Sequence, residues 1–226
     1  MKLSIIIPVL NEAGRIAVAL IALQPLRERG AEILVVDGGS TDGTAEIAAR
    51  GADHVVHAPR GRASQQNAGA QQALGDTFIF LHSDTQLPLD ADGLIADALN
   101  DGAVHWGRFD LRFDTDQTML RIVATMMNAR SRLTGIATGD QCLFARRSAF
   151  EAVGGFPALA LMEDIALSTL LRRQSAPACL RNKVTTSARR WQKNGVWRTI
   201  FLMWWLRLAY AFGVSPARLA RWYGPS

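Results

Sequence analysis

Continuous apolar runs separated by helical segments constrain the fold of this chain more than any other feature. Residues 3–10 read LSIIIPVL, and comparable runs follow at residues 31–39, 53–59 and 77–84. Strands of a parallel sheet contain such runs because helices cover both of their faces. The intervening residues have helical spacing, and the first predicted helix stops near Pro25. This β-α-β-α-β-α-β order predicts an α/β fold with a mostly parallel sheet and helices on both faces.

The second half of the chain is less regular. Its predicted elements are helices at residues 94–100, 118–133 and 162–173 and a strand at residues 103–113. No internal repeat, low-complexity run or clear linker interrupts the sequence. We therefore predict one domain over residues 1–188 and a C-terminal helical extension over residues 189–226.

Charge is distributed unevenly along the chain. Residues 165–226 contain eleven Lys or Arg and no Asp or Glu, whereas residues 1–164 contain fourteen basic and twenty acidic residues. The first part therefore carries a formal charge of −6 and the tail +11, in agreement with the total of +5. The tail also contains five of the six tryptophans. A basic, Trp-rich end on an acidic body indicates a separate role for the tail.

The apolar segment at residues 199–214 is too short for a membrane span, which needs about 20 apolar residues, and Arg207 interrupts it. Two interpretations remain, a helix at a lipid surface or a helix packed on the domain. Four arginines around the Trp cluster favour contact with anionic headgroups: Arg198, Arg207, Arg218 and Arg221. The spacing is more typical of a lipid-facing helix than of a nucleic-acid reader, so no nucleic-acid partner is expected.

Two cysteines, Cys142 and Cys179, are too few for a disulfide framework and have no histidine at zinc-ligand spacing. The first residues do not have the pattern of a signal peptide, because Pro8 and then Asn11 break a short apolar run. We expect a cytoplasmic protein, peripheral at the cytoplasmic face of the cell membrane.

Polar side chains follow three of the predicted strands. Asn11 and Glu12 come after the first strand, Asp37 after the second and Asp84 after the fourth. Each alone is a common turn residue. Ligands of open α/β sheets bind at the carboxyl ends of the strands, so together these residues predict a shared site. The stretch DGGSTDGT at residues 37–44 lets a ligand approach the backbone, but no P-loop or dinucleotide fingerprint is present.

The segments SIIIPVLNE, ILVVDGGSTDGT, RASQQNAG and FLHSDT, in this order, resemble the family 2 glycosyltransferases with the GT-A fold. GDQCLFARRSAF, GGF and MEDIALS continue the resemblance. It implies a Rossmann-like GT-A domain from a small, single-domain bacterial branch. The implied reaction moves a sugar from a nucleotide-diphosphate sugar to an acceptor hydroxyl, lipid-linked or hydrophobic, with Mg²⁺ or Mn²⁺.

The resemblance also implies roles for individual residues. The donor-binding residues would be Pro8, Asn11, Glu12, Asp37, Arg62, Asn67 and Arg190. Glu12 would lie near the ribose, Asp37 would bind the base or ribose, and Arg62 and Asn67 would lie beside the base and phosphates. The family's usual arginine before the motif's Asn is Gln66 here. In TSARRW, Ser187 replaces the Gln of processive members, and Arg190 either neutralises phosphates or ends a solvated basic helix.

Asp84 corresponds to the last carboxylate of the family's D-x-D motif, which binds the divalent metal. Hard cations prefer carboxylate oxygens and stabilise the charge of a departing diphosphate. His82 occupies the position of the first carboxylate. It would hold Asp84, touch a phosphate, or serve only as a turn residue.

Glu163 and Asp164 begin a predicted helix, where an acidic pair commonly complements the helix dipole. The resemblance implies that Asp164, with Glu163 as the alternative, is the general base that deprotonates the acceptor. Direct displacement then predicts inversion at the anomeric carbon.

Two other functions are compatible with the sequence. A nucleotidyltransferase would normally have a Gly-rich loop with Arg and Lys after the first strand, and residues 8–16 lack it. A non-catalytic, membrane-associated binding protein would keep the fold without the chemistry.

Overall fold

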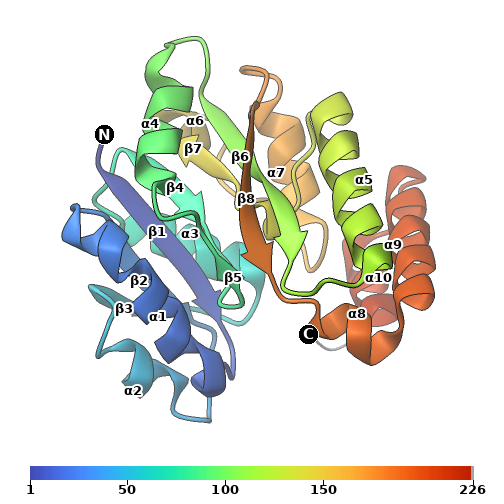
Figure 1. Ribbon diagram of the computed structural model, residues 1–226, viewed down its shortest axis with the longest axis horizontal. Helices are drawn as coiled ribbons and strands as arrows, with labels where there is room; N and C mark the ends of the chain where they lie inside the picture. Colours follow the sequence, from blue (N-terminus) through green and yellow to red (C-terminus); the bar gives the residue numbers. More distant parts are fainter. Residues whose placement is uncertain (225–226) are drawn as a thin grey trace.

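The computed structural model describes residues 1–224 and contains an eight-stranded sheet with the order β3-β2-β1-β4-β7-β6-β8-β5 (Figure 1). One half of the sheet is parallel throughout. Its strands are β1 (Leu3–Val9), β2 (Glu32–Asp37), β3 (His54–His57) and β4 (Thr77–Phe80). Val9, Asp37 and His57 are aligned across β1, β2 and β3, so the carboxyl ends of these strands lie at one edge.

The other half is mixed. Its strands are β7 (Phe144–Arg146), β6 (Trp106–Phe113), β8 (Ala178–Thr186) and β5 (Thr85–Gln86). β7 is antiparallel to β4 and β6, β8 is parallel to β6, and β5 is antiparallel to β8. The predicted α/β fold is confirmed. Strand β8 was not predicted, because Arg181, Asn182 and Lys183 are exposed and interrupt the apolar pattern opposite a register shift in β6.

Helices cover both faces of the sheet, as predicted. They are α1 (Ala13–Glu28), α2 (Thr44–Ala48), α3 (Arg62–Gln72), α4 (Ala91–Asn100), α5 (Thr118–Thr134), η1 (Gly139–Gln141, a 3₁₀ turn), α6 (Arg147–Ala152), α7 (Glu163–Leu171), α8 (Arg189–Asn194), α9 (Val196–Ala211) and α10 (Pro216–Tyr223). Residues of α1, α4 and α5 line one core, and residues of α3, α6 and α7 line the other.

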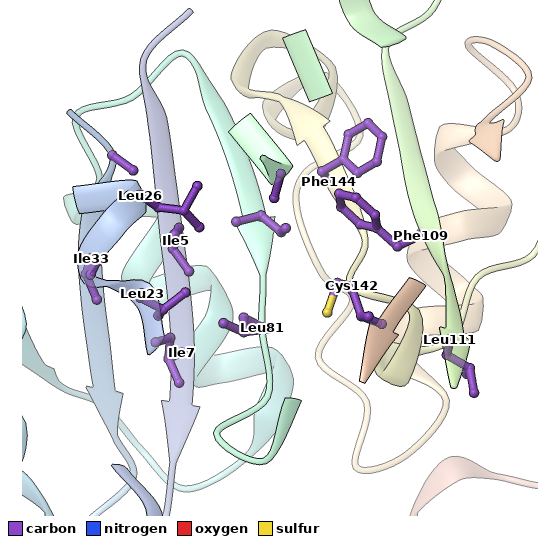
Figure 2. Packing of buried hydrophobic residues seen from close by; sticks show 14 of the residues in the cluster. Ile5, Ile7, Leu23, Leu26, Ile33, Leu81, Phe109, Leu111, Cys142 and Phe144 are labelled. Atoms are coloured by element: carbon purple, nitrogen blue, oxygen red, sulfur yellow. The ribbon is translucent and has the colours of Figure 1, made fainter. Parts of the chain in front are cut away.

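The isoleucines of β1 show why its apolar run is continuous. Ile5 and Ile7 pack in the first core with Leu23 of α1, whereas Ile6 packs in the second core with α3. Figure 2 shows Ile5, Ile7 and Leu23 together, with Phe109 and Phe144 across the same core. Alternate side chains of a strand point to opposite faces, so both faces of β1 need apolar residues.

The predicted helix stop near Pro25 is wrong, because α1 continues to Glu28. A proline inside a helix removes one backbone hydrogen bond and crowds the preceding turn. Leu23 and Leu26, on either side of it, are each only 2% exposed and pack in the core. Burial of these two side chains on the sheet outweighs the local penalty.

The C-terminal helices pack on the domain at least in part. Trp191 of α8 is buried against Phe113, with ring centroids 5.5 Å apart. Leu206 and Ala209 of α9 form a small third core with Met162, which precedes α7. Among the residues described, no helix has the length and apolar character needed to cross a membrane.

Candidate active site

Two loops at the carboxyl ends of β1 and β2 are tied together. The backbone N–H of Asn11 donates to Ser40 Oγ at 2.9 Å, and Asn11 Oδ1 accepts the N–H of Thr41 at 2.9 Å. Asn11 has a φ of 54°, in the left-handed region that asparagine tolerates better than most residues. The loops therefore form a rigid polar rim at this edge.

Asp37 is almost fully buried at this rim. Its carboxylate accepts the backbone N–H groups of Gly39 and Ser40, each at 3.1 Å, and lies 3.5 Å from His57 Nδ1. Burial by itself would raise the pKa of Asp37, but the bonds from Ser40 and Gly39 and the nearby His57 lower it below its ordinary value. Asp37 is thus an ionised acceptor that also holds its own loop.

Pro8 and Glu12 lie on the same side of the sheet. The pairing of β1 with β4 ends at Ile6, two residues before Pro8. The N–H that proline lacks is therefore not needed for a hydrogen bond between β1 and β4. The carboxylate of Glu12 pairs with Arg15 at 2.8 Å, and its backbone N–H donates to Thr44 Oγ1 at 2.8 Å.

Gln65 was not singled out from the sequence, yet it joins the ends of two strands. Its Nε2 donates to the carbonyl oxygens of Val9 and Val36, each at 2.8 Å. A Cβ at Gly38 would lie 3.0 Å from the Gln65 amide, so the glycine lets this side chain pass under the loop. The only sequence signal for this role was the position of Gln65 within the segment RASQQNAG, one turn after the start of the helix.

Asn67 binds backbone that is 89 residues away in the chain. Its Nδ2 donates to the carbonyl of Phe156 at 2.8 Å, and its Oδ1 accepts the Phe156 N–H at 2.9 Å. Neighbouring Gln66 is buried, and its Oε1 has no hydrogen-bond partner within residues 1–224. One donor and one acceptor position of the Asn67 amide are thus engaged within the protein, and its predicted place beside the base and phosphates stays a prediction.

His82 and Asp84 leave the sheet after β4. His82 Nδ1 lies 3.5 Å from Asp140 Oδ1, and a Cβ at Gly139 would lie 2.6 Å from His82 Cε1. Burial by itself would raise the pKa of Asp140. The pairing with His82, and then the charges of Arg62 and Arg190, lower this pKa below its ordinary value. Asp84 is partly exposed, and Thr85 Oγ1 is 3.5 Å from its carboxylate. Asp140 was not among the residues predicted from the sequence, although it lies in the GDQ segment that supports the resemblance.

Asp164 is fixed at the first turn of α7. Its Oδ2 accepts the N–H of Gly139 at 2.8 Å and its Oδ1 accepts the N–H of Ile165 at 2.7 Å. Asp164 remains partly exposed, whereas Glu163 is buried. Burial and then the charge of Asp164 raise the pKa of Glu163, and Arg62 opposes that shift.

Two predicted cationic residues lie among these acids. Burial by itself would lower the pKa of Arg62, but the phenol of Tyr223 and the carboxylates of the site, Glu163 first among them, raise it. Arg190 stacks on the ring of Tyr223, with 3.5 Å between the guanidinium carbon and the ring centroid. Burial lowers the pKa of Arg190, and Asp140 opposes the shift. Helix α8 therefore contributes to the site, and Arg190 is not a free basic end.

A metal site made by protein side chains alone is absent from residues 1–224, where no three His, Cys, Asp or Glu side chains gather. The available donors nevertheless suit Mg²⁺ or Mn²⁺. Asp84 and Asp140 offer partly exposed oxygens, and these ions take the rest of their shell from phosphates and water.

The family model described as Glycosyl transferase family 2 matches residues 4–154. No curated protein matches the sequence. Among solved structures, the chain is similar to the mannosyltransferase PcManGT from Pyrobaculum calidifontis in complex with GDP-Man and Mn²⁺. The identity is 22%, the TM-score is 0.70, and the match covers 98% of this chain and 68% of that one.

The chain is also similar to S. aureus TarS 1-349 in complex with UDP-GlcNAc. That match has 19% identity and a TM-score of 0.67 and covers 83% of this chain but only 58% of the TarS chain. A third neighbour is glucosyl-3-phosphoglycerate synthase from Mycobacterium tuberculosis, at 18% identity and a TM-score of 0.61, covering 82% of this chain and 69% of that one. These similarities establish the fold.

Proposed function

The chain belongs to glycosyl transferase family 2 and has the GT-A fold, and from this premise we propose that it transfers a sugar from a nucleotide-diphosphate sugar to an acceptor hydroxyl, with inversion. Complexes of the structural neighbours with UDP-GlcNAc and GDP-Man support this donor class. The observation that carries the proposal is the fixed, partly exposed carboxylate of Asp164 beside the pair of His82 and Asp140.

The donor would lie along the rim from β2 to η1. Pro8, Asn11 and Glu12 would shape the nucleoside pocket, and the buried Asp37 would accept hydrogen bonds from the base or ribose. Arg62, and Arg190 from α8, would face the diphosphate. These residue types match the nucleoside and the diphosphate of a nucleotide-diphosphate sugar.

Asp84, with His82 or Asp140 as a second ligand, would hold Mg²⁺ or Mn²⁺, which when bound would neutralise charge on the diphosphate. Asp164 takes the proton of the acceptor hydroxyl as its oxygen bonds to the anomeric carbon. The bond from that carbon to the diphosphate breaks, and the nucleoside diphosphate leaves with the electron pair. Asp164 suits this role better than Glu163 because Asp164 is the more exposed of the two.

The test combines donor binding with transfer. Nucleotide sugars are screened with Mn²⁺ by thermal shift, since a ligand of the native state raises its melting temperature. Asp164→Asn should bind the donor like the wild type but lose about 10²–10⁴-fold in transfer rate. Asp84→Ala should lose the Mn²⁺ dependence of donor binding. Asp97→Asn, an exposed change on α4, is the matched control. Full transfer by both site variants would refute the proposal.

We also propose that helix α9 contacts an anionic membrane surface, in keeping with a lipid-linked or hydrophobic acceptor. One face of the helix is an exposed aromatic stripe, in which every member is at least 52% exposed: Trp197, Phe201, Trp204, Trp205, Leu208 and Phe212. The opposite face packs in the third core, while Trp205 of the stripe lies beside Trp222 of α10, with ring centroids 6.3 Å apart, and the stripe remains largely exposed. Figure 1 shows α9 at the side of the molecule opposite α2. Exposed Arg198, Arg218 and Arg221 suit anionic headgroups.

Vesicle sedimentation tests this contact. The protein should bind phosphatidylglycerol vesicles more tightly than phosphatidylcholine vesicles, and replacing Trp204 and Trp205 by Ser should abolish binding without lowering stability. Ile21→Ser, at an exposed apolar position on α1, is the control and should bind normally. Vesicle binding by a protein that binds no nucleotide sugar would indicate a non-catalytic membrane protein instead.

A further inference from the structure

An arginine on α5 has two buried N–H donor atoms that no group among residues 1–224 accepts. Arg130 Nε and Nη2 are buried, and neither has a hydrogen-bond partner within residues 1–224. A guanidinium stays charged at physiological pH, and a buried charge without a partner is unfavourable. Arg108, farther into the same region, keeps its carboxylate partner Asp110. The unused donors of Arg130 therefore require a reason.

A second arginine lies in the same region but comes from α9. Leu206 and Ala209, on either side of Arg207, pack in the third core with Met162, and Ile165 packs against that core. Met162 and Ile165 flank the acidic pair at the start of α7. Arg207 therefore lies near the start of α7, where the charge of Asp164 acts on it.

The electrostatics agree with this arrangement. Burial and then the charge of Arg207 lower the pKa of Arg130 to about 10, while Asp164 opposes the shift. Burial also lowers the pKa of Arg207, against the attraction of Asp164 and Asp140. Neither arginine takes part in an ion pair among the described residues. Two half-buried cations thus repel each other beside one carboxylate that already accepts two backbone N–H groups.

We infer that Arg130 and Arg207 bind an oxyanion, a phosphate or a carboxylate, on the acceptor and hold its hydroxyl at Asp164. An oxyanion would supply the missing acceptors and remove the repulsion between the two guanidinium groups. The donor diphosphate has its own proposed cations, Arg62 and Arg190. Figure 1 shows α5 and α9 on one side of α7 and the nucleotide-binding strands β1 and β2 on the other. This inference rests on the proposed function, because it assigns the second substrate of the same reaction.

The test uses inorganic phosphate and acetate as probes on the full chain, by calorimetry at constant ionic strength, with and without UDP or GDP plus Mn²⁺. The wild type should bind one of the two anions, and the tighter one identifies the oxyanion class. Arg130→Met and Arg207→Met should each weaken that binding roughly 10–100-fold, the usual effect of losing a charge-assisted hydrogen bond. Arg121→Met, the same change at an exposed position on α5, should not affect it.

Thermal unfolding separates binding from a structural role. Arg130→Met should melt no lower than the wild type, because the variant removes a buried charge without a partner. Lower stability with unchanged anion affinity would overturn the inference, and so would displacement of the anion by the nucleoside diphosphate and Mn²⁺. Donor binding is measured in parallel. A protein that binds nucleotide sugar but whose anion affinity is unaffected by both variants refutes this inference alone and leaves the proposed function standing.

Discussion

The substitution Asn67→Ala tests whether Asn67 stabilises the fold or binds the donor. Its amide makes two hydrogen bonds with the backbone of Phe156, one through each end of the amide group. Phe156 is 4% exposed, and its ring packs edge-on against Phe80, with centroids 4.7 Å apart. Asn67→Ala removes both bonds and leaves a buried N–H and carbonyl without partners.

The expected loss of stability follows from these contacts. Each buried backbone group left unsatisfied costs about 1–3 kcal/mol, so two groups cost roughly 2–6 kcal/mol. Alanine returns up to about 0.7 kcal/mol through its higher helix propensity in α3. For a chain of this size, each kcal/mol lowers the melting temperature by about 2–4 °C. Asn67→Ala should therefore melt at least about 3 °C below the wild type.

Urea unfolding and titration with the donor together distinguish a structural role of Asn67 from a role in donor binding. We expect Asn67→Ala to lose stability while the folded fraction binds the nucleotide sugar with unchanged affinity. Asn100→Ala, at the exposed end of α4, controls for the gain in helix propensity and should unfold like the wild type. Wild-type stability combined with a tenfold loss of donor affinity would refute this reasoning and support the role implied by the family resemblance.

Three further substitutions test other parts of the structure. Asp37 has a lowered pKa, so its carboxylate stabilises the fold above its unfolded pKa, and this stability is lost as pH falls through the folded pKa. Asp37→Asn should therefore flatten the acid limb of a plot of unfolding free energy against pH. Asp110→Ala strands the fully buried Arg108 and should cost about 3–5 kcal/mol in urea unfolding, much of it regained by adding Arg108→Met. Gly139→Ala sets a Cβ against His82 and should cost about 1–3 kcal/mol by the same measurement. Wild-type unfolding of this variant would contradict the packing of the His82 ring.

The site residues that could be predicted are the polar residues that come directly after a buried strand. Ligands of open α/β sheets bind at the carboxyl ends of the strands, so Asn11, Asp37 and Asp84 were predicted as candidate site residues from their positions after apolar runs. Asp140 and Gln65 were not found, because nothing local distinguishes them from ordinary loop and helix residues. Arg207 was predicted to interrupt an apolar helix and to contact anionic headgroups, because its place near α7 is created only by packing of its helix against Met162.

The sequence by itself determined the α/β architecture, the polar edge and the separation of an acidic body from a basic tail, because periodicity and charge are local properties. Only the tertiary structure decided which side chains meet. The contact of Asn67 with Phe156 joins residues 89 apart, and α8 and α9 bring Arg190 near Asp140 and Arg207 near Asp164. Such meetings depend on how elements pack, and packing is determined by the complementarity of whole faces and not by the preferences of single residues.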